Sequence, residues 1–122
     1  MNNRVVHFEI PCETPEKTIE FFQAVFDWKF QQFGTEPYWL AMTGDEKNPG
    51  INGAIMKKKD PRQPLVNSIL VDDIDAYAEK IEKAGGKMVV PKMTIPTVGY
   101  LAYFMDPDNN IHCIWQQDTS AK

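Results

Sequence analysis

The chain has 122 residues, of which 43% are hydrophobic, and a formal net charge of −4. The length is that of one domain, and the hydrophobic content favours a folded core over a disordered chain. The acidic balance argues against a nucleic-acid partner, because binding to phosphate needs a basic face.

The first half of the chain predicts a strand, a helix and three further strands. Alternation in the strand at 4–10 puts His7 and Glu9 on one face and apolar side chains on the other. A helix is expected from Pro15 to Phe26, with Thr14 as its N-cap. The further strands are expected at 28–33, 38–43 and 51–56.

The second half repeats this order. After a strand at 66–71, a helix is expected from about Ile74 to Ala84, with Asp72 as its cap and Asp75 resembling a capping box. The polar tail after Gln117 is expected to be frayed. Three more strands are predicted at 87–90, 99–105 and 110–116.

Self-similarity of this kind is the signature of an internal repeat. We interpret residues 1–122 as a single domain made of two modules, about 4–57 and 65–116, joined by a linker at 57–64. Two equal modules can form one curved sheet with a pocket between them.

The cysteine pattern and the N-terminus point to a cytoplasmic protein. The two cysteines, Cys12 and Cys113, fit neither a metal motif nor a disulfide framework. Residues 1–4 lack the apolar stretch of a signal peptide. No apolar run approaches the roughly 20 residues that cross a bilayer, so no membrane partner is expected.

Several short segments follow one another in a specific order along nearly the whole chain. They are His7–Ile10, Phe21–Phe30, Gly50–Met56, Val71–Asp73 with Gly85–Lys87, and Asp106–Asn110. In this order they resemble the vicinal oxygen chelate superfamily, which includes glyoxalase I, bleomycin-resistance proteins and extradiol dioxygenases. More narrowly, the chain is similar to a small bacterial branch of predicted lactoylglutathione-lyase-related proteins.

The resemblance implies an α+β fold, in which two tandem βαβββ modules form a cupped mixed sheet with the helices outside. It also implies a homodimer and a small-molecule ligand in the cup between the modules. Metal-dependent members hold a divalent ion there, and the ion stabilises negative charge that develops on the substrate.

Carried over residue by residue, the family's four ligand positions fall on His7, Val66, a position near Ala54, and Cys113. Only the imidazole and the thiol can ligate a metal, whereas a functional ion generally has at least three protein ligands. We therefore expect no native metal and no other cofactor.

His7 and Glu9 are the predicted catalytic pair, with the imidazole as general base and the carboxylate as its orienter. The alternatives are an ordinary hydrogen-bonded strand histidine and a structural or exposed glutamate. By the resemblance, His7 could also approach Cys113 and form a Cys–His dyad, although a small buried hydrophobe is the commoner role of such a cysteine.

Aromatic residues gather on the third strand of each module, at Tyr38, Trp39, Tyr100 and Tyr103. Half of each strand faces the cup, and the pattern does not say which half. The predicted ligand-binding residues are Trp39, Asn52, Asn67, Tyr100, Tyr103 and Cys113.

Three functions remain open from the sequence. The first is a metal-independent protein with lyase- or isomerase-like chemistry on a small organic molecule. The second is a binding protein that sequesters a toxic or antibiotic molecule, as bleomycin-resistance proteins do. The third is an interaction or sensing subunit with a vestigial pocket.

Overall fold

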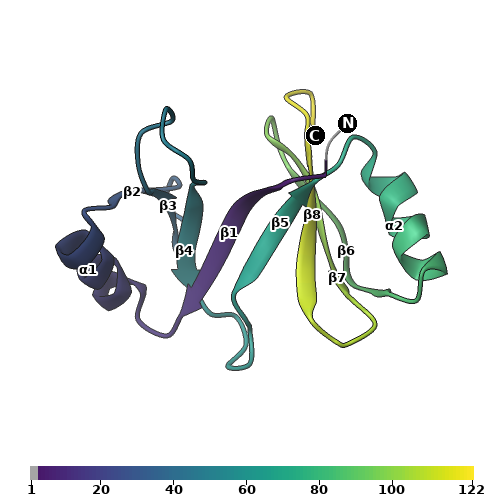
Figure 1. Cartoon of the computed structure of the whole chain (residues 1–122), viewed down its shortest axis with the longest axis horizontal. Helices are drawn as coiled ribbons and strands as arrows, with labels where there is room; N and C mark the ends of the chain where they lie inside the picture. The colour runs from purple at the N-terminus through teal and green to yellow at the C-terminus, as the bar shows by residue number, and fades with distance from the viewer. Residues whose placement is uncertain (1–2) are drawn as a thin grey trace. The chain divides into compact units, whose positions relative to one another are not determined.

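The computed structural model describes residues 3–122 and confirms the α+β class and the repeated order of strand, helix and three strands (Figure 1). The first repeat consists of β1 (Val5–Cys12), α1 (Pro15–Phe26), β2 (Lys29–Gln32), β3 (Tyr38–Met42) and β4 (Gly53–Lys57). The second consists of β5 (Val66–Leu70), α2 (Ile74–Lys83), β6 (Lys87–Ile95), β7 (Gly99–Met105) and β8 (Ile111–Gln117).

These elements form two compact units. The first unit spans His7–Leu65, and the second combines the described residues up to Val6 with Val66–Lys122. The boundary lies inside β1, because the chain before it is attached to the end of β5. There the Leu70 N–H donates to the Arg4 carbonyl, and the Asn3 side-chain amide donates to the Leu70 carbonyl.

In the first unit the strand order is β2-β3-β4-β1, with β1 parallel to β4 and the other pairs antiparallel. The aromatic cluster of Phe8, Phe22 and Trp28 joins α1 to one face of this sheet, and the rings of Phe22 and Trp28 stack with centroids 4.4 Å apart. Gly53 makes room for it, since a Cβ there would lie 2.5 Å from the Phe8 ring. Because side chains alternate along a strand, His7 and Glu9 lie on the face opposite α1.

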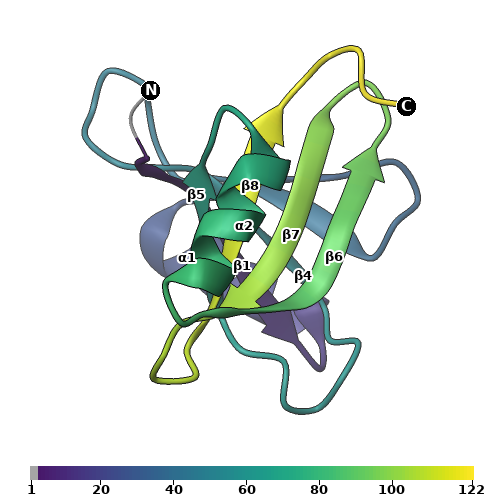
Figure 2. The same cartoon turned by 90° about the vertical axis from the view of Figure 1, so that its right-hand side faces the viewer.

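In the second unit the order is β5-β8-β7-β6, and α2 lies along one face of these strands (Figure 2). Its buried core contains Val71, Ile74, Ala102 and Ile114, with partly buried hydrophobic residues around it. The face opposite α2 carries every second residue of β5, β7 and β8, including Ser68, Tyr103 and Cys113.

The two helices are capped differently. Thr14 is the N-cap of α1, as predicted, but its side chain makes no capping hydrogen bond. The prediction of Asp72 as the cap of α2 was wrong by one residue. Asp73 is the N-cap, because its backbone is extended and its carboxylate accepts the N–H of Ala76.

Two further expectations were wrong at chain segments rich in polar residues. The tail after Gln117 is not frayed, because the Ala121 carbonyl accepts the N–H of Thr97 and Ala121 is only 3% exposed. Strand β6 continues to Ile95, well past the predicted end, with irregularities of register that accommodate the longer pairing with β7. Within residues 3–122, no helix is long and apolar enough to span a membrane.

Candidate functional site

A chain of hydrogen bonds joins three side chains on the face of the first unit opposite α1. The Tyr38 hydroxyl donates to Glu9 Oε2 over 3.0 Å, and the oxygen of that hydroxyl also lies 3.0 Å from His7 Nε2. All three residues are partly buried, so their side chains are held in place while part of each remains accessible. The arrangement links an imidazole to a carboxylate through one phenol.

Tyr38 reaches the other two residues across a strand. In the sheet order, β4 lies between β3, which carries Tyr38, and β1, which carries His7 and Glu9. Ala54 of β4 pairs with Glu9 on one side and with Leu40 on the other, and it is fully buried. A methyl group at this position takes up little of the space between β3 and β1 on this face.

Burial lowers the pKa of His7 below its ordinary value of 6.5, and the negative charge of Glu9 opposes part of this effect. Desolvation penalises the charged imidazolium, so the ring is neutral near pH 7. A neutral imidazole can accept a proton, and a nearby carboxylate stabilises the cation that results. The three side chains therefore have the composition of a general base with an anionic support.

The resemblance implies a metal ion in some members, and such an ion needs at least three protein ligands. Among residues 3–122, no three His, Cys, Asp or Glu side chains are gathered in a way that could hold a metal ion. In the first unit the donors are one imidazole and one carboxylate, and His7 Nε2 is already bonded to a hydroxyl. This set does not fit a resident metal with three or four protein ligands.

Three of the predicted ligand-binding residues lie on the faces that pack against helices. Trp39 alternates with Tyr38 and pairs with Ile55, which places it on the α1 side. Tyr100 packs against the core beneath α2, and Asn67 lies on the same side of β5 as Ile69. Ligand binding by these residues stays a prediction, and their faces weigh against it.

The other predicted residues lie elsewhere. Tyr103 and Cys113 are paired on the face opposite α2, and Cys113 is only 2% exposed, with its thiol directed to the Ile114 carbonyl. Asn52 uses its side-chain oxygen to accept the backbone N–H of Thr43, a bond that closes the loop before β4. His7 and Cys113 belong to different units, so the Cys–His dyad stays a prediction. The homodimer also stays a prediction.

Tyr38 is the residue that the sequence interpretation left out of the site. The sequence places Tyr38 among four aromatic residues of the third strands, and the predicted ligand-binding residue is its neighbour Trp39. The close approach of Phe8 to Gly53 could have indicated which side of β4 faces the helix. Using it requires the pairing of β1 with β4, which the sequence does not display. Without that register, two adjacent aromatic residues give no indication of which one faces His7.

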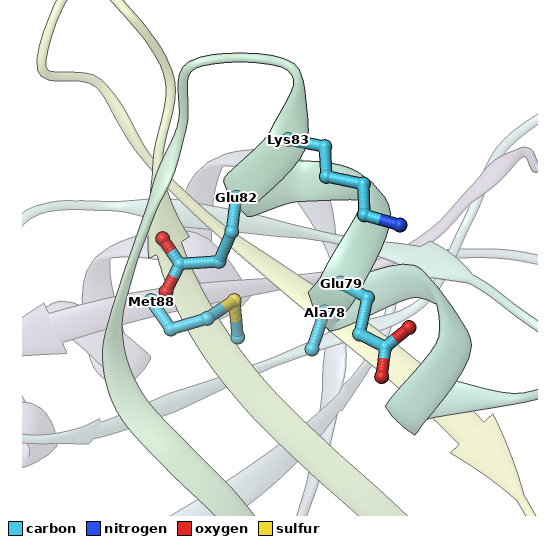
Figure 3. Close-up of a pocket in the computed structure, with 5 residues that line it drawn as sticks. All are labelled: Ala78, Glu79, Glu82, Lys83 and Met88. Carbon is cyan, nitrogen blue, oxygen red and sulfur yellow. The ribbon is translucent and has the colours of Figure 1, made fainter.

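A surface depression of about 320 Å³ lies in the second unit, formed by α2 and the start of β6 (Figure 3). Figure 3 shows that the Lys83 ammonium group points away from Met88, which forms the other wall. The lining residues are Ala78, Glu79, Glu82, Lys83 and Met88. We assign no chemistry to this depression.

Two βαβββ repeats, each with a mixed sheet and a helix on one face, define the class of protein. The chain belongs to the Glyoxalase/Bleomycin resistance protein/Dioxygenase superfamily, whose family model matches residues 4–114. It is 30% identical to a glyoxylase-like domain-containing protein of Didymella fabae, over 93% of this chain and 94% of that protein.

Solved structures agree with this assignment at the level of the fold. A superfamily member from Vibrio splendidus 12B01 has a TM-score of 0.67 and 14% identity, covering 95% of this chain and 99% of that one. Methylmalonyl-CoA epimerase in complex with methylmalonyl-CoA has a TM-score of 0.69 and 11% identity, covering 100% and 99%.

Proposed function

We propose that this chain catalyses a proton transfer on a small carbonyl compound, with His7 as the general base and Glu9 as its anionic support. The observation that carries the proposal is the hydrogen-bonded chain from His7 through Tyr38 to Glu9. Such a reaction is of isomerase or lyase type, which agrees with membership in a superfamily named for glyoxalases.

The chemistry needs no external oxidant or reductant. A ring nitrogen of His7 takes a proton from the carbon next to the substrate carbonyl, so a C–H bond breaks and an N–H bond forms. The electron pair of the C–H bond moves toward the carbonyl oxygen as an enolate. Return of the proton from the imidazolium to a carbon of the enolate completes an isomerisation and restores the neutral base.

Glu9 contributes in the charged intermediate state. When the imidazole takes a proton, it becomes a cation in a partly buried setting where the cation is costly. The carboxylate raises the pKa of His7 against the effect of burial, so it favours the protonated ring. Proton transfer by a positioned general base such as His7 typically contributes about 10²–10⁴-fold in rate.

We propose that the reaction is independent of metal. The donor set of this site supplies two ligand types, and the Nε2 atom of His7 is already bonded to Tyr38. We therefore expect activity to persist in the presence of a strong chelator. Near-stoichiometric zinc, nickel, manganese or iron in protein purified without a tag, lost in His7→Ala, would contradict this part of the proposal.

The test is exchange of substrate hydrogen with solvent. The full chain is incubated in D₂O with a panel of small 2-oxo acids, hydroxyketones and thioesters, and loss of the C–H signal next to the carbonyl is followed by proton NMR. We expect at least one class to exchange faster with wild type than with His7→Asn, by about 10²–10⁴-fold. If wild type and His7→Asn give equal rates for every class, the proposed base is wrong.

His112→Gln is the matched control, because it removes the chain's other histidine. His112 lies in the second unit, where it is bonded to Asp106 at the turn between β7 and β8. Its exchange rate should equal that of wild type. A panel member that binds saturably without any exchange would instead favour sequestration, the alternative expected from the bleomycin-resistance resemblance.

A further inference from the structure

The hydroxyl of Tyr38 has one proton to share between two neighbours. That proton goes to Glu9 Oε2, because the oxygen of an ionised carboxylate can only accept a hydrogen bond. The contact with His7 Nε2 must then run the other way, with the ring nitrogen donating to the phenol oxygen. The protons are thus ordered from imidazole to phenol to carboxylate.

This order has a consequence for the ring. A neutral imidazole carries one N–H and one lone pair, and the bond that one nitrogen makes decides where the proton resides. If Nε2 holds the hydrogen, Nδ1 holds the lone pair. The lowered pKa of His7 keeps the ring in this neutral form near pH 7.

We infer that Tyr38 is the positioning residue of the site: it fixes His7 as the Nε2–H tautomer, leaves Nδ1 as the basic atom, and connects the ring to the Glu9 carboxylate. The inference deepens the proposed function and rests on it for its catalytic meaning. The tautomer itself can be measured without any substrate.

The route through the phenol also explains how the carboxylate acts on the ring. When Nδ1 takes a proton, the imidazolium keeps its Nε2–H bond to Tyr38, and Tyr38 keeps its bond to Glu9. No hydrogen bond has to be broken or reversed during the reaction, so the chain is already arranged for the charged state. Tyr38 therefore need not touch the substrate to matter for the rate.

The experiment uses the full chain with ¹⁵N-labelled histidine. The chain has only two histidines, so the ring signals of His7 are assigned by their persistence in His112→Gln. Long-range ¹H–¹⁵N correlations distinguish a protonated ring nitrogen from one with a lone pair. At a pH where the ring is neutral, wild type should show a protonated Nε2 and an unprotonated Nδ1.

Two variants at Glu9 make the prediction directional. In Glu9→Met the hydroxyl loses its acceptor and turns its proton toward His7, so the ring should reverse to the Nδ1–H tautomer. In Glu9→Gln the amide oxygen can still accept from Tyr38, so the Nε2–H tautomer should be retained. A tyrosine with a merely structural role would leave the tautomer the same in both variants.

Tyr38→Phe provides a measurement that does not depend on Glu9 variants folding. Without the hydroxyl, the two ring nitrogen signals should move toward each other as the tautomers mix. An Nδ1–H tautomer in wild type, or unchanged ring signals in Tyr38→Phe, would overturn the inference. If the tautomer behaves as expected but no compound exchanges hydrogen, the proposed function fails while the role of Tyr38 in setting the tautomer stands.

Discussion

The two units share one topology but carry different side chains on the faces opposite their helices. In the first, Glu9 of the opening strand pairs with Ala54; in the second, Ser68 pairs with Cys113. Glu9 and Ser68 also lie at the same distance in sequence before the first residue of their helices. The pair of Glu9 and Ala54 is therefore equivalent, within the repeat, to the pair of Ser68 and Cys113.

From this equivalence the rest of the site can be compared. His7 corresponds to Val66, since each lies two positions before Glu9 or Ser68 along its strand. Tyr38 corresponds to Leu101, because each lies two positions before the residue of its strand that pairs with Ala54 or Cys113. Where the first unit has an imidazole, a carboxylate and a phenol, the second has a valine, a serine and a leucine.

The difference shows that the scaffold does not require polar residues at these positions. Val66 is 5% exposed and Ser68 is 4% exposed, so in the second unit small and uncharged groups are buried at the positions equivalent to His7 and Glu9. The first unit instead keeps three titratable or polar side chains partly buried, where polar groups are costly unless they are hydrogen-bonded. Buried polar groups that cost stability and that the fold does not require are typical of a functional site.

The largest expected effect comes from giving the first unit the residues of the second. The triple variant His7→Val, Glu9→Ser, Tyr38→Leu should lose hydrogen exchange by about 10²–10⁴-fold, because base and support are both gone. The fold should be kept, since these residues already occupy the equivalent register. Exchange is measured by proton NMR in D₂O and folding by circular dichroism; full activity in a folded triple variant would contradict the assignment of the site.

Part of this site follows from sequence and part does not. The alternation of β1 predicted that His7 and Glu9 share a face, because their neighbours Phe8 and Ile10 are apolar and belong with the helix. The helix boundaries of α1 followed from its proline and its apolar spacing. These are local patterns with periods that a sequence displays directly.

Tyr38 could not be identified in that way. Strand β3 is apolar or aromatic on both faces, so alternation gives no parity for it. Its bonds join residues about 30 positions apart and depend on the strand order β3-β4-β1, which is a tertiary property. The cap of α2 failed for a related reason, because adjacent aspartates at 72 and 73 are chemically equal and only the backbone conformation selects one.

A second prediction tests whether Tyr38 reaches Glu9 by passing over the small residue Ala54 of β4. Ala54→Leu inserts a branched side chain at a fully buried position, and overpacking of this kind costs about 1–3 kcal/mol. It should also push Tyr38 away from Glu9 and mix the His7 tautomers. Urea denaturation and the ¹⁵N ring signals measure the two effects.

The matched control is Ala54→Cys, which places there the residue found at the equivalent position of the second unit. The smaller thiol should cost less stability than leucine and disturb the ring signals less. If the leucine variant keeps the wild-type tautomer, the path of Tyr38 across Ala54 is wrong.

A third prediction sharpens the difference between the helix starts. Asp73→Ala removes a capping bond to the Ala76 N–H and should destabilise the chain by about 1 kcal/mol. Thr14→Ala removes a side chain that makes no capping bond, so its effect should be close to zero. Urea denaturation of both variants against wild type measures the contrast, and equal losses would show that the two caps do not differ as described.

The smallest expected effect is a dependence of stability on pH that comes from His7 in the first unit. Because burial lowers the pKa of His7, the unfolded chain binds a proton between 6.5 and that lowered value while the folded chain does not. The free energy of unfolding should therefore fall as the pH drops through this window and recover above it. His7→Asn should remove this component and leave the loss at lower pH that carboxylates cause.

Glu9→Gln tests the same pH dependence by increasing it, whereas His7→Asn removes it. The charge of Glu9 raises the pKa of His7, so its removal should lower that pKa further and widen the window in which acid destabilises the fold. Urea unfolding of wild type, His7→Asn and Glu9→Gln between about pH 7.5 and about pH 5 distinguishes these cases. A Glu9→Gln variant less sensitive to acid than wild type in this range would mean that the carboxylate does not act on the ring, and the polar chain of the first unit would then have no electrostatic function.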